Sequence, residues 1–147
     1  MSDVILIESP PTVAEYIVLR QQIGWGVIDE DTARRTIDGA CYTVCLRREG
    51  RLLGLVRLIG DGCLYFAFSD VMVSPELQGG GHGARMMRAA VEYLRRAAKP
   101  GASITLQPLA GREAFYEKFG FVRCPSGPFG QGMVFADAPP PVGGRFG

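Results

Sequence analysis

The sequence has no apolar run long enough to cross a membrane. A transmembrane helix needs about 18 to 20 consecutive apolar residues, and no stretch of the 147-residue chain approaches that length. The N-terminus carries Asp3 and lacks the basic segment and long apolar run of a secretory signal. We therefore expect a cytoplasmic protein that is not bound to a membrane.

The sequence also has a single histidine, no C-x-x-C pair and almost no net charge. The 16 basic and 15 acidic residues leave a net charge of +1, too little for a field that would attract nucleic acid. His82 is the single histidine, and the four cysteines form no C-x-x-C pair, so no metal site is expected. We interpret the cysteines as small buried thiols in a reducing compartment: Cys41, Cys45, Cys63 and Cys124.

Length and composition predict one globular domain. A chain of 147 residues with 47% hydrophobic and 21% charged residues can bury a core without disulfides. We expect this domain to span residues 1–137. Residues 138–147 contain prolines and glycines without periodicity and are expected to be a disordered tail.

The order of the elements predicts an α/β fold. Met87, Val91, Leu94 and Ala98 recur at intervals of four, three and four, as on one face of a helix. Strands are expected at 4–7, 41–47, 52–59, 63–73, 103–107, 121–123 and 131–135, and helices at 12–23, 29–39, 84–98 and 111–119. Short polar turns join the strands between 41 and 73 as an antiparallel meander. We expect a mixed, mostly antiparallel central sheet flanked by helices.

A glycine cluster between a strand and a helix is the most informative segment. Four of the five residues 79–83 are glycines, and the predicted helix follows directly. Glycines let the backbone approach a ligand, and the first N–H groups of a helix lack intrahelical partners, so the segment predicts phosphate binding. The alternative is a flexible loop in which a glycine only caps the helix, but such a loop would need fewer than the four glycines present here.

Two nucleotide-binding motifs fit this segment poorly. Gly79, Gly81 and Ala84 satisfy the dinucleotide fingerprint G-x-G-x-x-G/A, but the strand over 103–107 ends without the required acidic residue. The P-loop motif fails because Gly83 is followed by Ala84 and Arg85. A nucleotide-binding protein is therefore a distant alternative.

Two motifs resemble those of the GCN5-related N-acetyltransferases, the GNAT family. Residues 73–83 are similar to the family's Q/R-x-x-G-x-G/A signature with its preceding strand, and residues 115–121 resemble a helix that ends in a tyrosine followed by Gly-Phe. The resemblance extends over about 4–135 and implies acetyl-CoA as the acetyl donor. The implied acetyl-CoA-binding residues are Val71, Met72, Val73, Gln78, Gly79, Gly80, Gly81, His82, Gly83, Ala84 and Arg85.

The resemblance also implies an activity: acetyl transfer to a primary amine of a small molecule or peptide by direct attack. Tyr116 is the implied general acid, because a phenol near the sulfur can protonate the departing thiolate; packing beside Phe115 and Phe119 is its alternative role. Trp25, between two glycines, is expected to line the acceptor site, although a core position is equally consistent.

Several positions depart from the family pattern. Many members have Lys or Arg at the position of Gly80 and a branched aliphatic residue at that of His82, so Arg85 is a candidate to compensate. Leu109 replaces an asparagine that contacts the cofactor arm. Ala67 stands where the histone-acetylating branch has its catalytic glutamate.

No general base is assigned. The candidates are Asp61, Asp70 and Glu76, and a water chain would also serve; His82 is interpreted as a loop residue and Cys63 as a core residue. A non-catalytic acyl-CoA-binding or sensor module of the same fold therefore remains the alternative function. The oligomeric state, monomer or homodimer, stays open.

Overall fold

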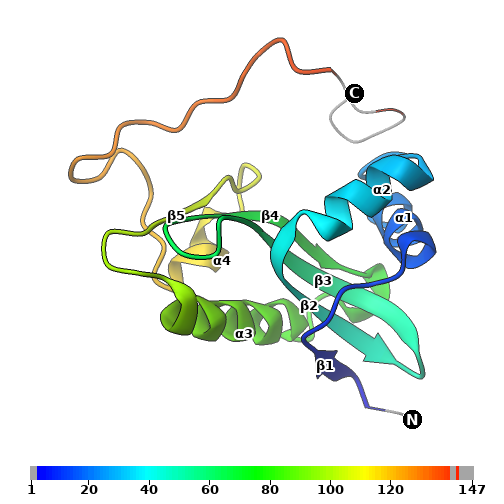
Figure 1. Cartoon of the computed structure of the whole chain (residues 1–147). Coiled ribbons are helices and arrows are strands. Elements are labelled where there is room, and N and C mark those ends of the chain that lie inside the picture. Colours follow the sequence, from blue (N-terminus) through cyan, green and yellow to red (C-terminus); the bar gives the residue numbers. More distant parts are fainter. Residues whose placement is uncertain (1–2, 140–141, 143–147) are drawn as a thin grey trace.

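The chain forms one sheet with helices on both faces (Figure 1). The structure is a computed structural model that describes residues 3–139 and 142. The elements, in chain order, are β1 (Ile5–Ile7), α1 (Val13–Gln22), α2 (Glu30–Asp38), β2 (Ala40–Arg48), β3 (Arg51–Gly60), β4 (Tyr65–Val73), the 3-10 helix η1 (Pro75–Leu77), α3 (His82–Ala97), β5 (Ser103–Leu106) and α4 (Glu113–Glu117).

The sheet confirms the expected mixed, mostly antiparallel arrangement. Its strand order is β1-β2-β3-β4-β5, with antiparallel pairing from β1 to β4 and parallel pairing between β4 and β5. None of the helices in the described part of the chain combines the length and apolar character needed to cross a bilayer.

The two strands predicted after α4 were wrong. Residues 121–123 and 131–135 are irregular, and the side chains of Met133, Val134 and Phe135 are 93%, 76% and 78% exposed. The alternation of residues does not make a strand unless a neighbouring strand pairs with it. No strand of the described residues pairs with either segment. Of the predicted tail, residues 140–141 and 143–147 lie outside the described residues.

Local signals explain where the first two helices begin. The Thr12 side chain accepts a hydrogen bond from the Glu15 N–H, and the Glu15 side chain accepts one from the Thr12 N–H. This reciprocal pair is a capping box. Asp29 caps α2 by accepting from the Thr32 N–H, and Gly39 ends that helix as expected.

Each face of the sheet has its own hydrophobic core. The core under α3 and α4 consists of Val44, Leu46, Leu53, Val56, Leu58, Phe66, Phe68, Leu77, Met86, Met87, Ala90 and Leu94. The core under α1 and α2 consists of Tyr16, Leu19, Ala33, Ile37, Cys45, Leu55 and Met72. The buried thiols predicted from composition are confirmed only for Cys45, since Cys124 is exposed.

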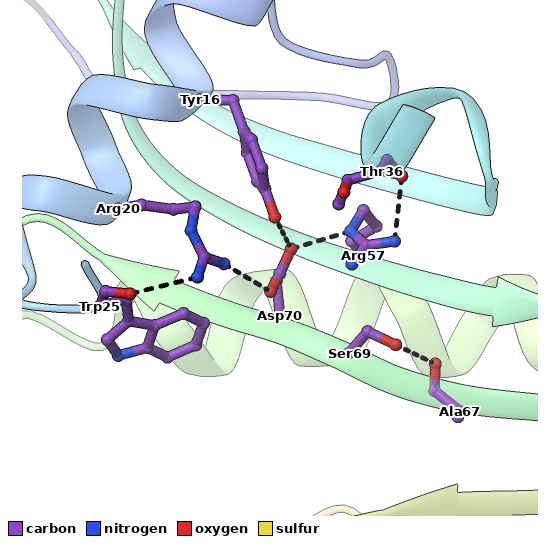
Figure 2. A network of polar contacts seen from close by, with 8 residues as sticks. All are labelled: Tyr16, Arg20, Trp25, Thr36, Arg57, Ala67, Ser69 and Asp70. Atoms are coloured by element: carbon purple, nitrogen blue, oxygen red, sulfur yellow. Dashed lines mark hydrogen bonds and ion pairs between the residues drawn. The ribbon is translucent and has the colours of Figure 1, made fainter. Parts of the chain in front are cut away.

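A β-bulge in β4 decides which side chains face α1 and α2. Arg57 of β3 pairs with Asp70, but the next residue, Leu58, pairs with Phe68, so Ser69 is an extra residue. Phe66 and Phe68, before the bulge, face the α3 core. After it the alternation is shifted by one, and Asp70 is directed toward α1 and α2 (Figure 2).

One partly buried ion pair gives a pH-dependent prediction. Arg47 binds Glu15 through both terminal nitrogens at 2.7 and 2.9 Å, and these hydrogen bonds lower the pKa of Glu15 from 4.5 to about 2. Glu15→Gln keeps a side-chain oxygen that can accept the Thr12 N–H hydrogen bond, but it removes the negative charge. The free energy of unfolding should therefore fall by about 1 kcal/mol at pH 7. In urea unfolding the difference should persist down to about pH 4.5 and vanish as the pH falls toward 2.

The control is Asp31→Asn, which removes an ion pair whose side chains are 82% and 72% exposed. It should change the unfolding free energy by less than about 0.5 kcal/mol at any pH. An equal and pH-independent loss in both variants would show that the Glu15 charge does not stabilise the fold.

Candidate active site

The predicted glycine loop connects β4 to α3 and is open to its surroundings. Gly79 and Gly81 have φ values of +85° and +78°, and a Cβ atom added to either residue would meet no atom within 4 Å. Gly81 caps α3 without a side-chain hydrogen bond, and the first turn of α3 contains no acidic residue. Because the first N–H groups of a helix lack intrahelical acceptors, this end of α3 is suited to an anion.

Side chains around the loop hold its shape. The Gln78 Nε2 atom donates to the Val73 carbonyl oxygen at 3.2 Å, so the loop turns back onto the last residue of β4. Arg85 Nη1 donates to the carbonyl oxygen of Val4 at 3.1 Å and lies 3.2 Å from His82 Nδ1. Arg85, the expected compensating cation, is therefore partly engaged with the segment before β1.

Helix α4 packs directly against the start of α3. A Cβ atom at Gly83 would lie 3.4 Å from Cζ of Phe115 and 3.7 Å from Cγ2 of Val73, so the missing side chain makes room for the Phe115 ring. Tyr116 follows Phe115 and is half-buried, and the centroids of these two rings lie 5.0 Å apart. The Tyr116 ring also contacts the Phe121 ring edge-on. The fold thus brings the predicted phosphate loop and the predicted general acid into one region.

The sheet opens beside this region. Parallel pairing between β4 and β5 extends only from Tyr65–Ser103 to Phe68–Leu106. From Ser69 to Val73, no strand of the described residues pairs with β4 on the β5 side. The backbone of 69–73 therefore has no strand partner on that side, including at the expected residues Val71 and Val73, although the Val73 carbonyl oxygen accepts from Gln78 Nε2. The Met72 side chain is buried in the α1 core.

A buried polar cluster lies on the α1 side of the bulge (Figure 2). Asp70 Oδ2 accepts from Tyr16 Oη at 2.6 Å and from Arg57 Nε at 2.8 Å, and Asp70 Oδ1 lies 3.9 Å from Arg20 Nη1. Arg57 Nη1 also donates to the Thr36 carbonyl oxygen, and burial and the Asp70 carboxylate raise the pKa of Tyr16 to about 12. The cluster ties α1 and α2 to the centre of the sheet.

Trp25 lies next to this cluster. Its ring is half-buried against the α1 core, and the Arg20 guanidinium carbon lies 5.7 Å from the ring centroid. Arg20 Nη2 donates to the Trp25 carbonyl oxygen at 3.2 Å (Figure 2). Trp25 is thus placed between the α1 core and the polar cluster.

The three carboxylates considered as bases are engaged elsewhere. Asp70 is buried and hydrogen-bonded by a tyrosine and an arginine. Glu76 forms an ion pair with Arg51 at 2.8 Å. Asp61 accepts hydrogen bonds from the N–H groups of Tyr65, Cys63 and Leu64, which lower its pKa. The geometry therefore favours none of the three.

The sequence did contain a signal for the cluster. Arg57 and Asp70 each interrupt an otherwise apolar strand, and a buried charge normally needs a partner. Tyr16 and Arg20 are four residues apart and so lie on the same face of α1. What brought these four residues together, however, was the shift of alternation at Ser69.

Removing one donor tests how strongly the cluster stabilises the fold. Tyr16→Phe deletes a buried hydrogen bond to a carboxylate and should lower the free energy of unfolding by about 1 to 3 kcal/mol in urea titration. The same change at Tyr65, which is 65% exposed, should cost less than about 0.5 kcal/mol. Equal stabilities of the two variants would contradict the role given to the Tyr16 hydroxyl.

Comparison with known proteins identifies related chains. The family model for the acetyltransferase (GNAT) domain matches residues 38–123, more than half of the chain. A search of curated protein sequences found no match.

Solved structures show the same fold. A protein of unknown function from meticillin-resistant Staphylococcus aureus, described as a probable acetyltransferase, is 28% identical with a TM-score of 0.80, covering 90% of this chain and 98% of the other. A GNAT family acetyltransferase from Streptococcus pneumoniae is 20% identical with a TM-score of 0.72, covering 90% and 97%. A GNAT N-acetyltransferase from Escherichia coli, in complex with CoA, is 14% identical with a TM-score of 0.61, covering 83% and 70%.

Proposed function

Because this chain belongs to the GNAT acetyltransferase family, we propose that it transfers the acetyl group of acetyl-CoA to a primary amine of a small molecule or peptide. The observation that carries this proposal is the glycine-lined start of α3 beside the gap between β4 and β5, with Tyr116 of α4 in the same region.

The donor-binding residues follow from this geometry. The uncapped N–H groups at the start of α3 would bind the pyrophosphate, with Gly79 and Gly81 leaving space for it. The unpaired part of β4, Val71 to Val73, would hold the pantetheine arm by its backbone groups. The CoA complex of the Escherichia coli relative supports CoA binding by this fold. The proposed set is completed by Gln78, Gly80, His82, Gly83, Ala84 and Arg85.

The reaction needs one bond to form and one to break. The neutral amine attacks the thioester carbonyl directly, the C–N bond forms, and the C–S bond breaks with its electron pair on sulfur. Tyr116 donates its phenolic proton to that sulfur, and the proton lost by the amine nitrogen returns the phenol to its neutral form through solvent. Trp25, beside Arg20, would form a wall of the acceptor site.

A non-catalytic acyl-CoA-binding module is the second candidate. Two observations favour it: Ala67 lies where one branch of the family has a glutamate, and Asp61, Asp70 and Glu76 are all engaged in structural contacts. A sensor of this kind would bind the donor without consuming it.

Turnover separates the two candidates. The protein is incubated with acetyl-CoA and a panel of amines, free CoA thiol is measured with a thiol reagent, and products are identified by mass spectrometry. An enzyme should release one thiol for each N-acetylated amine formed. Saturable CoA binding without thiol release above spontaneous hydrolysis, across the whole panel, would favour the binding module and contradict the proposed activity.

A further inference from the structure

The polar cluster at Asp70 contains more positive than negative charge. Two guanidinium groups, those of Arg57 and Arg20, face this one carboxylate (Figure 2). Among residues 3–139, no other carboxylate forms an ion pair with either arginine. The third member, Tyr16, contributes a neutral hydroxyl. One positive charge in a largely buried position therefore lacks a counter-charge, and such a charge is costly unless it is paired.

Arg20, rather than Arg57, is the arginine that lacks a counter-charge. Arg57 Nε binds Asp70 at 2.8 Å, and its side chain is 10% exposed. Arg20 reaches the same carboxylate only at 3.9 Å, and its buried Nε has no hydrogen-bond partner in the described part of the chain. Its side chain as a whole is 19% exposed, against 10% for Arg57.

Arg20 also lies close to the point where the sheet opens. Its partner Asp70 follows the bulge residue Ser69, at the point where β4 loses its pairing with β5. The guanidinium is flanked by two rings, with 5.8 Å to the Tyr16 centroid and 5.7 Å to the Trp25 centroid. The two rings restrict the guanidinium, Nη2 donates to the Trp25 carbonyl oxygen, and the N–H without an acceptor among the described residues is Nε–H, which suits an oxygen-bearing anion.

We propose that the acceptor amine carries a carboxylate, and that this carboxylate binds the Arg20 guanidinium beside Trp25. This inference rests on the proposed acetyltransferase function and narrows its substrate class to amino acids and related amino-carboxylates. A carboxylate matches the guanidinium geometry and supplies one negative charge, which is the charge that the cluster lacks, whereas a phosphate monoester carries about −1.5 to −2.

The first test compares acceptors that differ only in this group. Amino acids and the corresponding amino acid amides are assayed in pairs, for instance L-phenylalanine with L-phenylalaninamide, together with phosphoethanolamine as a phosphate-bearing amine. The wild type should prefer carboxylates over amides by at least about 10-fold in kcat/KM. Arg20→Gln should reduce this preference to about 3-fold or less, and Arg20→Lys should retain part of it.

Arg35→Gln is the matched control, because it removes an arginine of α2 whose side chain is 82% exposed. It should leave the preference unchanged. Since Arg20 also holds the Trp25 carbonyl oxygen, melting temperature and CoA affinity are measured on every variant. A preference that survives Arg20→Gln in a folded protein, or equal use of amides and carboxylates by the wild type, would overturn the inference.

A second measurement does not depend on turnover. Trp25 is the single tryptophan of the chain, so the intrinsic tryptophan fluorescence reports directly on the ring beside Arg20. Titration with N-acetyl-L-phenylalanine should give a saturable fluorescence change in the wild type and in Arg35→Gln, and none in Arg20→Gln; the N-acetyl amide should give none in any variant. No response of the wild type to the carboxylate would contradict the inference.

The two proposals can therefore fail separately. Acetylation of neutral amines without any dependence on Arg20 would overturn the carboxylate inference and leave the proposed function standing. Absence of thiol release with every amine would count against the proposed function, while an Arg20-dependent response to the carboxylate would still support this binding site.

Discussion

Replacing Tyr116 with phenylalanine should lower kcat by about 10- to 10⁴-fold while CoA affinity stays near that of the wild type. The substitution removes one proton donor and almost no volume, and the ring contacts with Phe115 and Phe121 are retained. The departing thiolate would then have to take its proton from water. The measurement is steady-state turnover of acetyl-CoA with a saturating amine, together with calorimetric CoA titration.

The control is the same substitution at Tyr93 of α3, whose hydroxyl donates to the Cys41 carbonyl oxygen at 3.4 Å, away from the glycine loop. Tyr93→Phe should leave kcat within about 2-fold of the wild type. Wild-type kcat in Tyr116→Phe, under conditions where chemistry limits turnover, would show that Tyr116 only packs against its aromatic neighbours.

A side chain at Gly81 should weaken CoA binding on the order of 100-fold. A valine there would extend into the space that the backbone N–H groups at the start of α3 leave open for the pyrophosphate. Losing two hydrogen bonds to a charged group, at about 1.5 kcal/mol each, accounts for an effect of that size. Calorimetric CoA titration measures it.

Gly81 also has a φ of +78°, so any side chain there strains the backbone whether or not a ligand binds. Gly101→Val provides the matched control, because Gly101 has a φ of +86°, equally open surroundings and a position at the other end of α3. Both variants should lose similar stability, but only Gly81→Val should lose CoA affinity. Equal CoA affinities in the two variants would reject the phosphate role of the loop.

The sequence predicted those parts of the fold that depend on neighbouring residues. The start of α1 after Thr12 and the position of the glycine loop before α3 are specified within a few positions of the chain. The meander from β2 to β4 follows from short polar turns. The family signature lies in the same local segments, and the family model confirms it.

What could not be predicted depends on contacts between distant residues. Tyr16 and Asp70 are 54 residues apart in the chain, and they meet only because the bulge at Ser69 shifts the alternation of β4. The spacing did not reveal this shift, because Phe66, Phe68 and Met72 continue one regular alternation along β4. The strand expected over 131–135 was wrong because alternation alone supplies no pairing partner.

The most direct test of the acetyl-CoA site is a crystal structure of this chain with CoA bound. The pyrophosphate should lie within hydrogen-bond distance of the N–H groups between Gly79 and Gly83, and the CoA sulfur within about 4 Å of Tyr116 Oη. The pantetheine arm should lie along β4 from Ser69 to Val73, where β5 no longer pairs. A pyrophosphate bound away from the start of α3, or a sulfur on the far side of the sheet from Tyr116, would contradict the proposed acetyl-CoA site.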